Sequence, residues 1–237
     1  MNVFQKLFVN LHTRPETRTI WRERLSCDWG KNNNHVYLIK DGQRRECTGI
    51  IKGLAIRIEG HDNCIEIDES CHFSKCDLWI TGNHNRIQFA EKARLTYLSV
   101  RMPDDNRLFS WGARSSCEKV RCFVQVKDLI VGTDCMFSDL IEIMTNDGHA
   151  VLDKNTRHVL NNIPGQMTIG NHVWVGRKVF MMKNANIPDD CIVGACALVT
   201  KPFTEPNCAI AGFPAKVVKQ GITWDGTPPA KYAKNQK

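Results

Sequence analysis

Hydrophobic residues recur every six positions in the C-terminal half of the 237-residue chain. An amphipathic helix repeats at about 3.6 residues and a strand at about 2, so neither produces this spacing. A hexad with two inward apolar positions is typical of a parallel β-helix, in which short strands meet at corners and successive coils stack. One row of such positions is Ile169, Val175, Met181, Ile187, Val193 and Val199, and a second is Val173, Val179, Ala185, Cys191 and Ala197.

The rows continue upstream, and one long excursion interrupts them. From Val131 to Ile169 is 38 residues, which is not a multiple of six, so the chain must leave the coil and return. We place this excursion at about residues 145–166. Long excursions on a regular scaffold often carry functional residues. The upstream rows are Val131, Phe137 and Ile143, and Phe123, Leu129, Cys135 and Ile141.

Towards the N-terminus the period loosens, although the repeat persists. Residues 60–67 are echoed by residues 82–89, at an offset of 22, which we interpret as larger coils of the same solenoid. The β-helix domain is therefore predicted to span 48–222. Residues 1–47 contain no hexads, and the helical spacing of Phe4, Leu7, Phe8 and Leu11 predicts a short helical or irregular cap. Residues 223–237 form a polar tail that we expect to be extended or disordered.

The net charge of +7 is concentrated at the two ends of the sequence. Residues 1–47 carry a net +4 and residues 201–237 another +4, whereas the centre carries −1. A basic end suits nucleic acid, a membrane surface, an acidic substrate or a phosphorylated cofactor, and composition does not choose among them.

Eleven cysteines are a high and odd number for a chain of this length. The apolar stretch 3–11 is interrupted by Lys6 and lacks a small-residue cleavage site, so we expect no export signal and reduced thiols in the cytoplasm. No apolar run approaches the roughly 20 residues that span a bilayer. Cys71 and Cys76 have a loose zinc spacing, but no second pair follows. The sequence therefore predicts no metal site.

Several motifs, in order, resemble one known family. The segment 169–176 reads IGNHVWVG, the segment 192–201 reads IVGACALVTK, and the segment 211–219 reads AGFPAKVVK. This sequence resembles the hexapeptide-repeat acyltransferases, most closely bacterial O-acetyltransferases that act on surface polysaccharides. The resemblance implies a left-handed parallel β-helix, a homotrimer with active sites between subunits, acetyl-CoA as the donor and a saccharide acceptor. It implies no nucleic-acid partner.

The family's catalytic histidine lies on a loop that leaves the coil, and His149 occupies the matching place. Neutral imidazole near pH 7 can remove the proton from a sugar hydroxyl as its oxygen attacks the thioester carbonyl. Asp147 or Asp153 is close enough in sequence to orient the imidazole. The backbone amide near Arg177 is a candidate donor to the oxyanion.

The resemblance assigns other positions to the donor. Trp174 would flank the acetyl group and pantetheine arm, and Ala195 would offer backbone groups to the pantetheine amides. Lysine ammonium groups would offset the phosphate charge of coenzyme A. These expected phosphate and nucleotide contacts are Thr200, Lys201, Lys216 and Lys219. Departures from the family's pattern include Arg177 and Cys196, where smaller residues are common.

Other interpretations stay open at this point. The same scaffold suits an N-acetyltransferase for a nucleotide-linked amino sugar, or an antibiotic-type acetyltransferase. A non-enzymatic scaffold or a zinc-dependent hydratase is also conceivable, although the spacing of His149, His158 and His172 does not resemble the hydratases. His61 and His84 occupy equivalent repeat positions, which indicates that they simply fill turns.

Overall fold

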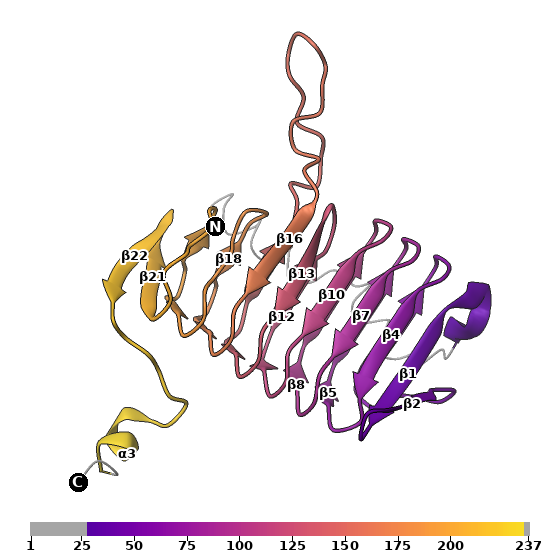
Figure 1. Ribbon diagram of the computed structural model, residues 1–237, viewed down its shortest axis with the longest axis horizontal. Helices are drawn as coiled ribbons and strands as arrows, with labels where there is room; N and C mark the ends of the chain where they lie inside the picture. Colours follow the sequence, from indigo (N-terminus) through magenta and orange to yellow (C-terminus); the bar gives the residue numbers. More distant parts are fainter. Residues whose placement is uncertain (1–27, 235–237) are drawn as a thin grey trace, which may run out of the picture.

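The computed structural model describes residues 28–234 and shows a three-sided parallel β-helix (Figure 1). The chain passes through three sheets, here called A, C and B in the order in which each coil visits them. This confirms the predicted left-handed parallel β-helix. The expected helix near residues 4–11 lies outside the described residues.

The three sheets run the length of the stack. Sheet A contains β1 (His35–Lys40), β4 (Cys64–Asp68), β7 (Arg86–Phe89), β10 (Leu108–Trp111), β13 (Lys127–Val131) and β16 (Gly165–Ile169), with β2 (Gln43–Glu46) on its edge. Sheet B contains β3 (Leu54–Ile58), β6 (Cys76–Ile80), β9 (Leu98–Met102), β12 (Val120–Phe123), β15 (Ile141–Met144), β18 (Phe180–Met181) and β20 (Leu198–Val199). Sheet C contains β5 (His72–Ser74), β8 (Arg94–Thr96), β11 (Ser116–Cys117), β14 (Met136–Phe137), β17 (Trp174–Val175), β19 (Ile192–Val193), β21 (Cys208–Gly212) and β22 (Ala215–Gln220).

The coils shorten along the stack. Cys64 pairs with Arg86, a step of 22 residues, whereas Trp174 pairs with Ile192, a step of 18 or three hexads. Leu129 pairs with Met167, a step of 38, because the excursion lies between them. Strict hexads therefore appear only in the C-terminal coils, which is why the period loosens upstream.

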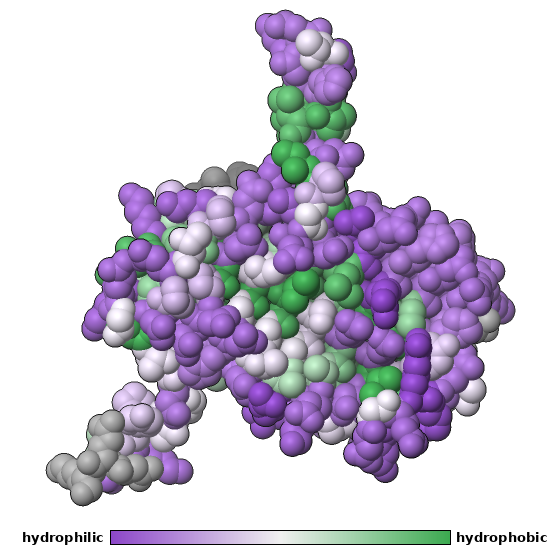
Figure 2. Space-filling model, viewed as in Figure 1, coloured by the Kyte–Doolittle hydropathy of each residue, from purple (hydrophilic) through white to green (hydrophobic). Residues whose placement is uncertain are grey.

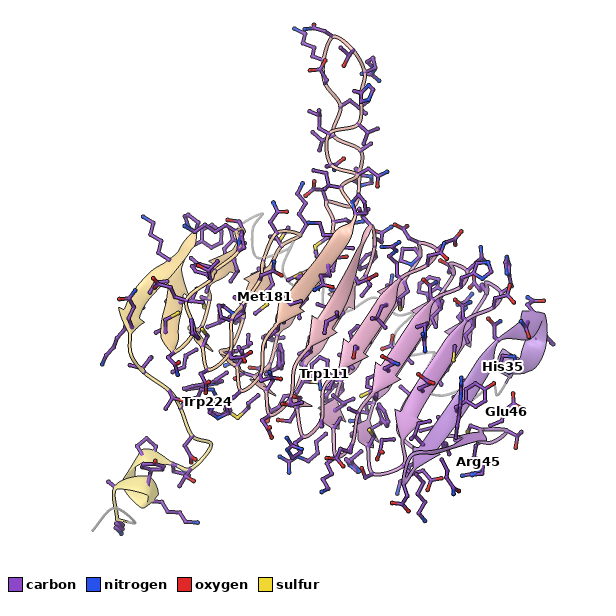
Figure 3. All side chains as sticks on the ribbon, in the orientation of Figure 1. His35, Arg45, Glu46, Trp111, Met181 and Trp224 are labelled. Atoms are coloured by element: carbon purple, nitrogen blue, oxygen red, sulfur yellow. The ribbon has the colours of Figure 1, made fainter. Side chains whose placement is uncertain are left out.

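Apolar residues of both rows fill the interior. Every residue of the two rows that begin at Ile169 and Val173 is buried. Larger aromatic side chains fill the wider coils, and the rings of Trp111 and Phe137 lie 4.9 Å apart inside the stack (Figure 3). Each methylene buried contributes about 0.8 kcal/mol, so this continuous core is the main stabilising contribution.

One predicted core position is wrong. Phe123 is only half-buried, because it lies on the outer face of β12, whereas its neighbours Cys122 and Val124 point inward. The six-residue step fails here because the local coil is longer than three hexads, and strand alternation decides which side chain points inward.

The ten cysteines of the described chain are free thiols. Most fill the interior; for example, Cys76 is buried and burial raises its pKa to about 11. Such thiols behave as small apolar residues.

The turns that follow the strands of sheet B form one long edge beside sheet A, here called the B/A edge: residues 59–63, 81–85, 103–107, 124–126, 145–164, 182–186 and 200–203. Buried asparagines bond successive turns, since Asn63 Nδ2 donates to the carbonyl of Gly82 at 3.0 Å. At Gly82, an added Cβ would lie 2.0 Å from the carbonyl oxygen of Asp104, so only glycine fits this close approach. The turns therefore stack tightly.

The two ends differ from the sequence expectation. Strand β1 pairs in parallel with β4, so sheet A already includes residues before position 48. The tail contains a short helix, α3 (Pro229–Lys234), which buries no side chain. None of the helices within residues 28–234 has the length and apolar character needed to cross a membrane.

Candidate active site

The excursion is a narrow hairpin that projects from the stack between β15 and β16 (Figure 1). Its two arms pair through an antiparallel bridge between Leu152 and Val159. The Asp153 N–H also donates to the carbonyl of His158 at 2.8 Å. These bonds give the excursion a defined shape, and it leaves the coil at the position that the interrupted hexads predict.

Asp153 closes the tip of the hairpin. Its Oδ1 accepts hydrogen bonds from the N–H groups of Asn155 (2.9 Å) and Thr156 (2.7 Å) and from the Thr156 hydroxyl (2.9 Å). These bonds, above all that from the Thr156 N–H, lower the pKa of Asp153. Asp153 thus caps its own turn, and within the described chain it makes no hydrogen bond with the His149 ring.

Asp147 anchors the base of the hairpin. Its Oδ2 accepts from the Lys183 ammonium and from Asn161 Nδ2, the latter at 2.8 Å. Lys183 chiefly, and then Asn161, lowers the pKa of Asp147, so this carboxylate stays ionised. Because Lys183 belongs to the next coil, after β18, the ion pair ties the excursion to the stack.

His149 lies two residues after Asp147 in the hairpin, and hydrogen bonds hold the backbone around it. Asn161 Nδ2 donates to the His149 carbonyl at 2.8 Å, and the Gly148 N–H donates to Asn146 Oδ1 at 3.0 Å. Gly148 has φ +77°, which glycine adopts without strain. The His149 side chain is exposed, and its ring has no hydrogen-bond partner among residues 28–234. A held backbone with an unengaged imidazole suits a base that acts on a bound substrate.

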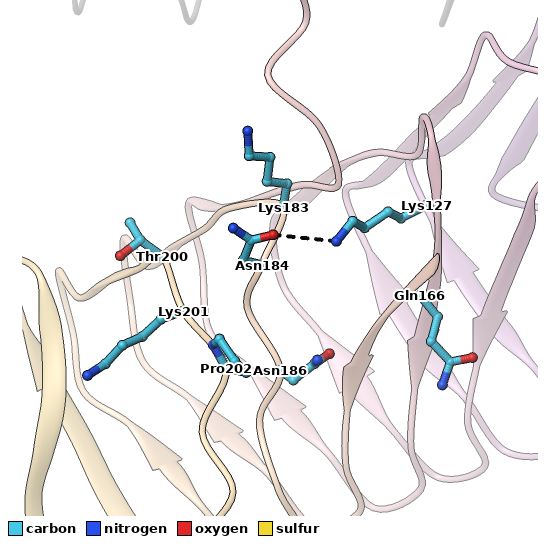
Figure 4. Close-up of a pocket in the computed structure, with 8 residues that line it drawn as sticks. All are labelled: Lys127, Gln166, Lys183, Asn184, Asn186, Thr200, Lys201 and Pro202. Carbon is cyan, nitrogen blue, oxygen red and sulfur yellow. Dashed lines mark hydrogen bonds between the residues drawn. The ribbon is translucent and has the colours of Figure 1, made fainter. Parts of the chain in front are cut away.

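A cleft with a volume of about 280 Å³ opens on the B/A edge beside the hairpin base (Figure 4). Three lysines contribute to its walls, and Lys127 Nζ donates to Asn184 Oδ1 at 3.4 Å. Of the three, Lys183 is paired with Asp147. The cleft is therefore electropositive and suits an anionic group. Its lining residues are Lys127, Gln166, Lys183, Asn184, Asn186, Thr200, Lys201 and Pro202.

The structure divides the residues expected to bind the donor between two places. Thr200 and Lys201 lie in the cleft, on the same edge as His149. The other expected contacts lie on sheet C and at the turns that lead from sheet C to sheet B. These are Trp174 on the outer face of β17, Arg177 and Ala195 in the turns, and Lys216 and Lys219 on β22. Sheet C lies opposite the B/A edge, so the cross-section of the coil separates Trp174 from His149 in one chain.

The segment after β22 folds back onto the Trp174 face. The Trp224 ring stacks on His172 with centroids 4.5 Å apart and lies 6.1 Å from the Trp174 ring. Trp224 Nε1 also donates to the His172 carbonyl at 2.7 Å (Figure 3). His172 in turn bonds Asp190 through Nδ1 at 2.8 Å. His172 is thus a support for Trp224, and nothing places it near His149.

Cationic and aromatic side chains alternate along the outer face of sheet B. Arg57, Trp79, Arg101 and Phe123 pair in register across four neighbouring strands, and we call them the Arg–aromatic column. The guanidinium carbons of Arg57 and Arg101 lie 5.0 Å and 4.7 Å from the Trp79 ring centroid. Phe123 is followed in register by Met144, the residue before the excursion. The column therefore leads along sheet B to the base of the His149 hairpin.

Sequence reasoning missed Lys183, Asn161 and this column. Lys183 and Asp147 are 36 residues apart, and only the stacking of coils brings them together. The column has a periodic signal, since its four members are spaced by 22 residues, the same offset that relates residues 60–67 to residues 82–89.

Comparisons with known proteins agree with the fold and the motifs. No family model matches the sequence. The chain is 32% identical over 110 residues to the polysialic acid O-acetyltransferase of Escherichia coli O1:K1, covering 46% of this chain and 35% of that protein. It is 28% identical over 177 residues to the polysialic acid O-acetyltransferase of Neisseria meningitidis, covering 75% and 82%.

Among solved structures, the polySia-specific acetyltransferase NeuO superposes with a TM-score of 0.70 at 22% identity, over 78% of each chain. At 22% identity, this superposition is evidence for a shared fold and for no more than that. Together with the sequence matches, it confirms the resemblance to the hexapeptide-repeat acyltransferases and to their polysaccharide O-acetyltransferase branch. The chain spans only about a third of the length of the Escherichia coli relative.

Proposed function

We propose that this chain, a hexapeptide-repeat protein similar to polysaccharide O-acetyltransferases, transfers acetyl from acetyl-CoA to a hydroxyl of a bacterial surface polysaccharide or its precursor. The observation that carries the proposal is the position of His149. It lies on an ordered hairpin beside an electropositive cleft, with its backbone held by Asn161 and its ring unengaged in the described chain. The sequence similarity to two polysialic acid O-acetyltransferases supports the choice of reaction.

The proposed step is general-base catalysis. His149 takes the proton of the acceptor hydroxyl while the oxygen attacks the thioester carbonyl of acetyl-CoA. The tetrahedral intermediate collapses with cleavage of the carbon–sulfur bond. The imidazolium then returns its proton to the departing thiolate, so the products are the acetyl ester and coenzyme A. A backbone amide near Arg177 is the proposed donor to the oxyanion. Asp147 acts through the hairpin base, by its bond to Asn161.

The proposed active site lies between neighbouring chains of a homotrimer. In one chain the Trp174 face and His149 are on opposite sides of the coil, so they meet only if one chain's hairpin reaches the next chain's face. The hairpin also exposes Val151, Val159, Leu160 and Ile163, which are 47–63% exposed (Figure 2). Apolar side chains on a projecting arm favour burial against another surface. Coenzyme A would then contact Trp174, Ala195, Lys216 and Lys219 of one chain, near His149 of its neighbour.

A direct assay tests the reaction and its alternatives. The purified protein is incubated with acetyl-CoA and one acceptor at a time, and released coenzyme A thiol is measured. The acceptors are polysialic acid, a neutral polysaccharide, a nucleotide-linked amino sugar and chloramphenicol. We expect turnover with a polysaccharide and alkali-labile acetyl esters in the product. Turnover only with the amino sugar or the antibiotic would replace the proposal by one of the small-molecule alternatives.

The Arg–aromatic column is the proposed path of the polymeric acceptor. Aromatic rings and guanidinium groups offer stacking and hydrogen bonds to sugar rings and their carboxylates. Trp79→Ala is expected to raise KM for the polymer about 3–10-fold, the equivalent of one lost aromatic contact. KM for acetyl-CoA should not change, because Trp79 lies on the N-terminal side of the hairpin, away from the expected donor contacts.

Tyr97→Ala is the matched control for this measurement. Tyr97 is 44% exposed and lies in a turn between sheets C and B, outside the column, where its ring contacts Lys75. This variant should keep the wild-type KM for the polymer. Equal effects of the two substitutions, or an unchanged KM in Trp79→Ala, would remove the column from the acceptor path.

A further inference from the structure

Two histidines and an aspartate gather on the B/A edge, near the N-terminal end of the stack. They belong to two consecutive turns, 59–63 and 81–85, in which His61 precedes Asp62 and Asn83 precedes His84. The turns are locked together, because the His61 N–H donates to Asn83 Oδ1 and the His84 N–H donates to the His61 carbonyl, both at 3.0 Å. The side chains are therefore held by backbone bonds between coils.

The backbone at two of these residues is unusual. Asp62 and His84 both adopt a left-handed conformation with φ 56°, as does the equivalent Asn106 of the next coil with φ 57°. Few residues other than glycine occupy this region, with asparagine, aspartate and histidine the most tolerant. The repeated turn thus fixes the direction in which the Asp62 and His84 side chains leave the backbone.

The ligand atoms converge on one carboxylate oxygen. His61 Nδ1 lies 2.6 Å and His84 Nδ1 3.8 Å from Asp62 Oδ2, and ligand atoms of all three residues lie within 4.8 Å of one another. Nitrogen and oxygen ligands bind zinc at about 2.0–2.2 Å, so two ligands on the same ion are about 3–3.5 Å apart. The two measured distances fall on either side of this value. Small rotations of the imidazoles therefore bring all three atoms to one ion.

Neighbouring groups support a cation here. Asn33 Nδ2 donates to Asp62 Oδ1 at 2.5 Å, so a hydrogen bond already engages this oxygen. The second oxygen is left to face the histidines. Asp105 follows one coil later, where its Oδ1 accepts from the Asn83 N–H at 2.7 Å. The cluster and its neighbour thus combine two imidazoles with two carboxylates.

We propose that His61, Asp62 and His84 form a binding site for one divalent transition-metal ion, with zinc as the best match to two imidazoles and a carboxylate. The ion replaces the proton shared by His61 and Asp62, and solvent completes its coordination. It joins two coils through side chains. The site is separate from the proposed catalytic machinery, since two further turns, 103–107 and 124–126, lie between His84 and the excursion and none of the three ligands lines the cleft.

Cobalt and zinc titrations of the full-length, metal-free protein test this site. We expect one Co²⁺ per chain, visible by its d–d absorption, displaced by Zn²⁺, and a higher unfolding temperature with Zn²⁺ because the ion binds only the folded coils. His84→Asn and His61→Asn should each weaken binding by at least about tenfold. Both substitutions copy the asparagine found at the same place in the next coil, Asn106 and Asn83, so the turn should fold normally.

His72→Asn is the control, because His72 is exposed on β5, in sheet C. This variant should bind as tightly as the unmodified protein. The proposal is overturned if no ion binds in a one-to-one ratio, or if His84→Asn binds as tightly as the His72→Asn control. Neither readout depends on acetyl transfer, so the outcome is independent of the proposed function.

Discussion

His149→Ala is expected to lower kcat for acetyl transfer about 10²–10⁴-fold, the usual contribution of a positioned general base. The loss should fall on kcat, because the ring makes no structural hydrogen bond within residues 28–234 and its removal leaves the hairpin bonds of Asp147 and Asn161 in place. The measurement is initial-rate thiol release at saturating acetyl-CoA and acceptor. Calorimetric binding of coenzyme A should change little.

His158→Ala controls for the loss of any histidine from the excursion. His158 is exposed, and its carbonyl, not its ring, bonds the Asp153 N–H. This variant should retain wild-type turnover to within about twofold, as expected for a surface substitution. If His149→Ala also keeps turnover within a few fold, the base is another group and the proposed mechanism is wrong.

Mixing two inactive variants is expected to restore activity if the active site lies between chains. The first variant is His149→Ala, and the second combines Trp174→Ala with Lys216→Ala on the opposite face of the coil. In a trimer assembled at random from equal amounts, about one quarter of the sites join an intact hairpin to an intact face. The unfractionated population should therefore recover about one quarter of the wild-type rate per site, and trimers that contain both variants about one third, because one of their three sites is intact. Co-expression of two differently tagged chains gives the mixed species for assay.

The control mixture combines His149→Ala with a chain that carries both His149→Ala and the face substitutions. No site in that mixture has a histidine, so it should stay inactive. If the mixture of His149→Ala with the Trp174→Ala/Lys216→Ala chain has no more turnover than either variant alone, the hairpin of one chain and the face of its neighbour do not form a shared active site. An intrachain site would also leave this mixture inactive, because neither variant carries both an intact hairpin and an intact face.

The hexads predicted the β-helix correctly because each six-residue step places an apolar side chain in the interior. Ile187 and Val193 are buried where the six-residue step places them, since each 18-residue coil has three equal sides. The same step placed Phe123 inside, which is wrong, because its coil is longer and local strand alternation decides the direction of the side chain. The pairing of β1 with β4 gave no hexad signal at all.

The candidate site was predictable only in part. The place of the excursion follows from an interruption in the repeat, which is a property of local sequence, whereas the choice of His149 within it rests on the family resemblance. The bond between Asp147 and Lys183 depends on which turns stack, and that depends on how many residues the excursion inserts. The equivalent turn positions of His61 and His84 can be read from the 22-residue repeat. That both side chains lie near Asp62 depends on how the two coils stack, which the sequence pattern does not show.

The linear stacking of coils has a consequence for where chemistry can be placed. In such an array each coil contacts only its neighbours, so local opening begins at the two ends and spreads inward. The excursion is inserted between β15 and β16, with β13 and the earlier coils on one side and β17 to β21 on the other. Local unfolding that starts at either terminus must therefore open the intervening coils before it reaches His149. The base of the hairpin thus stays folded while the terminal coils open.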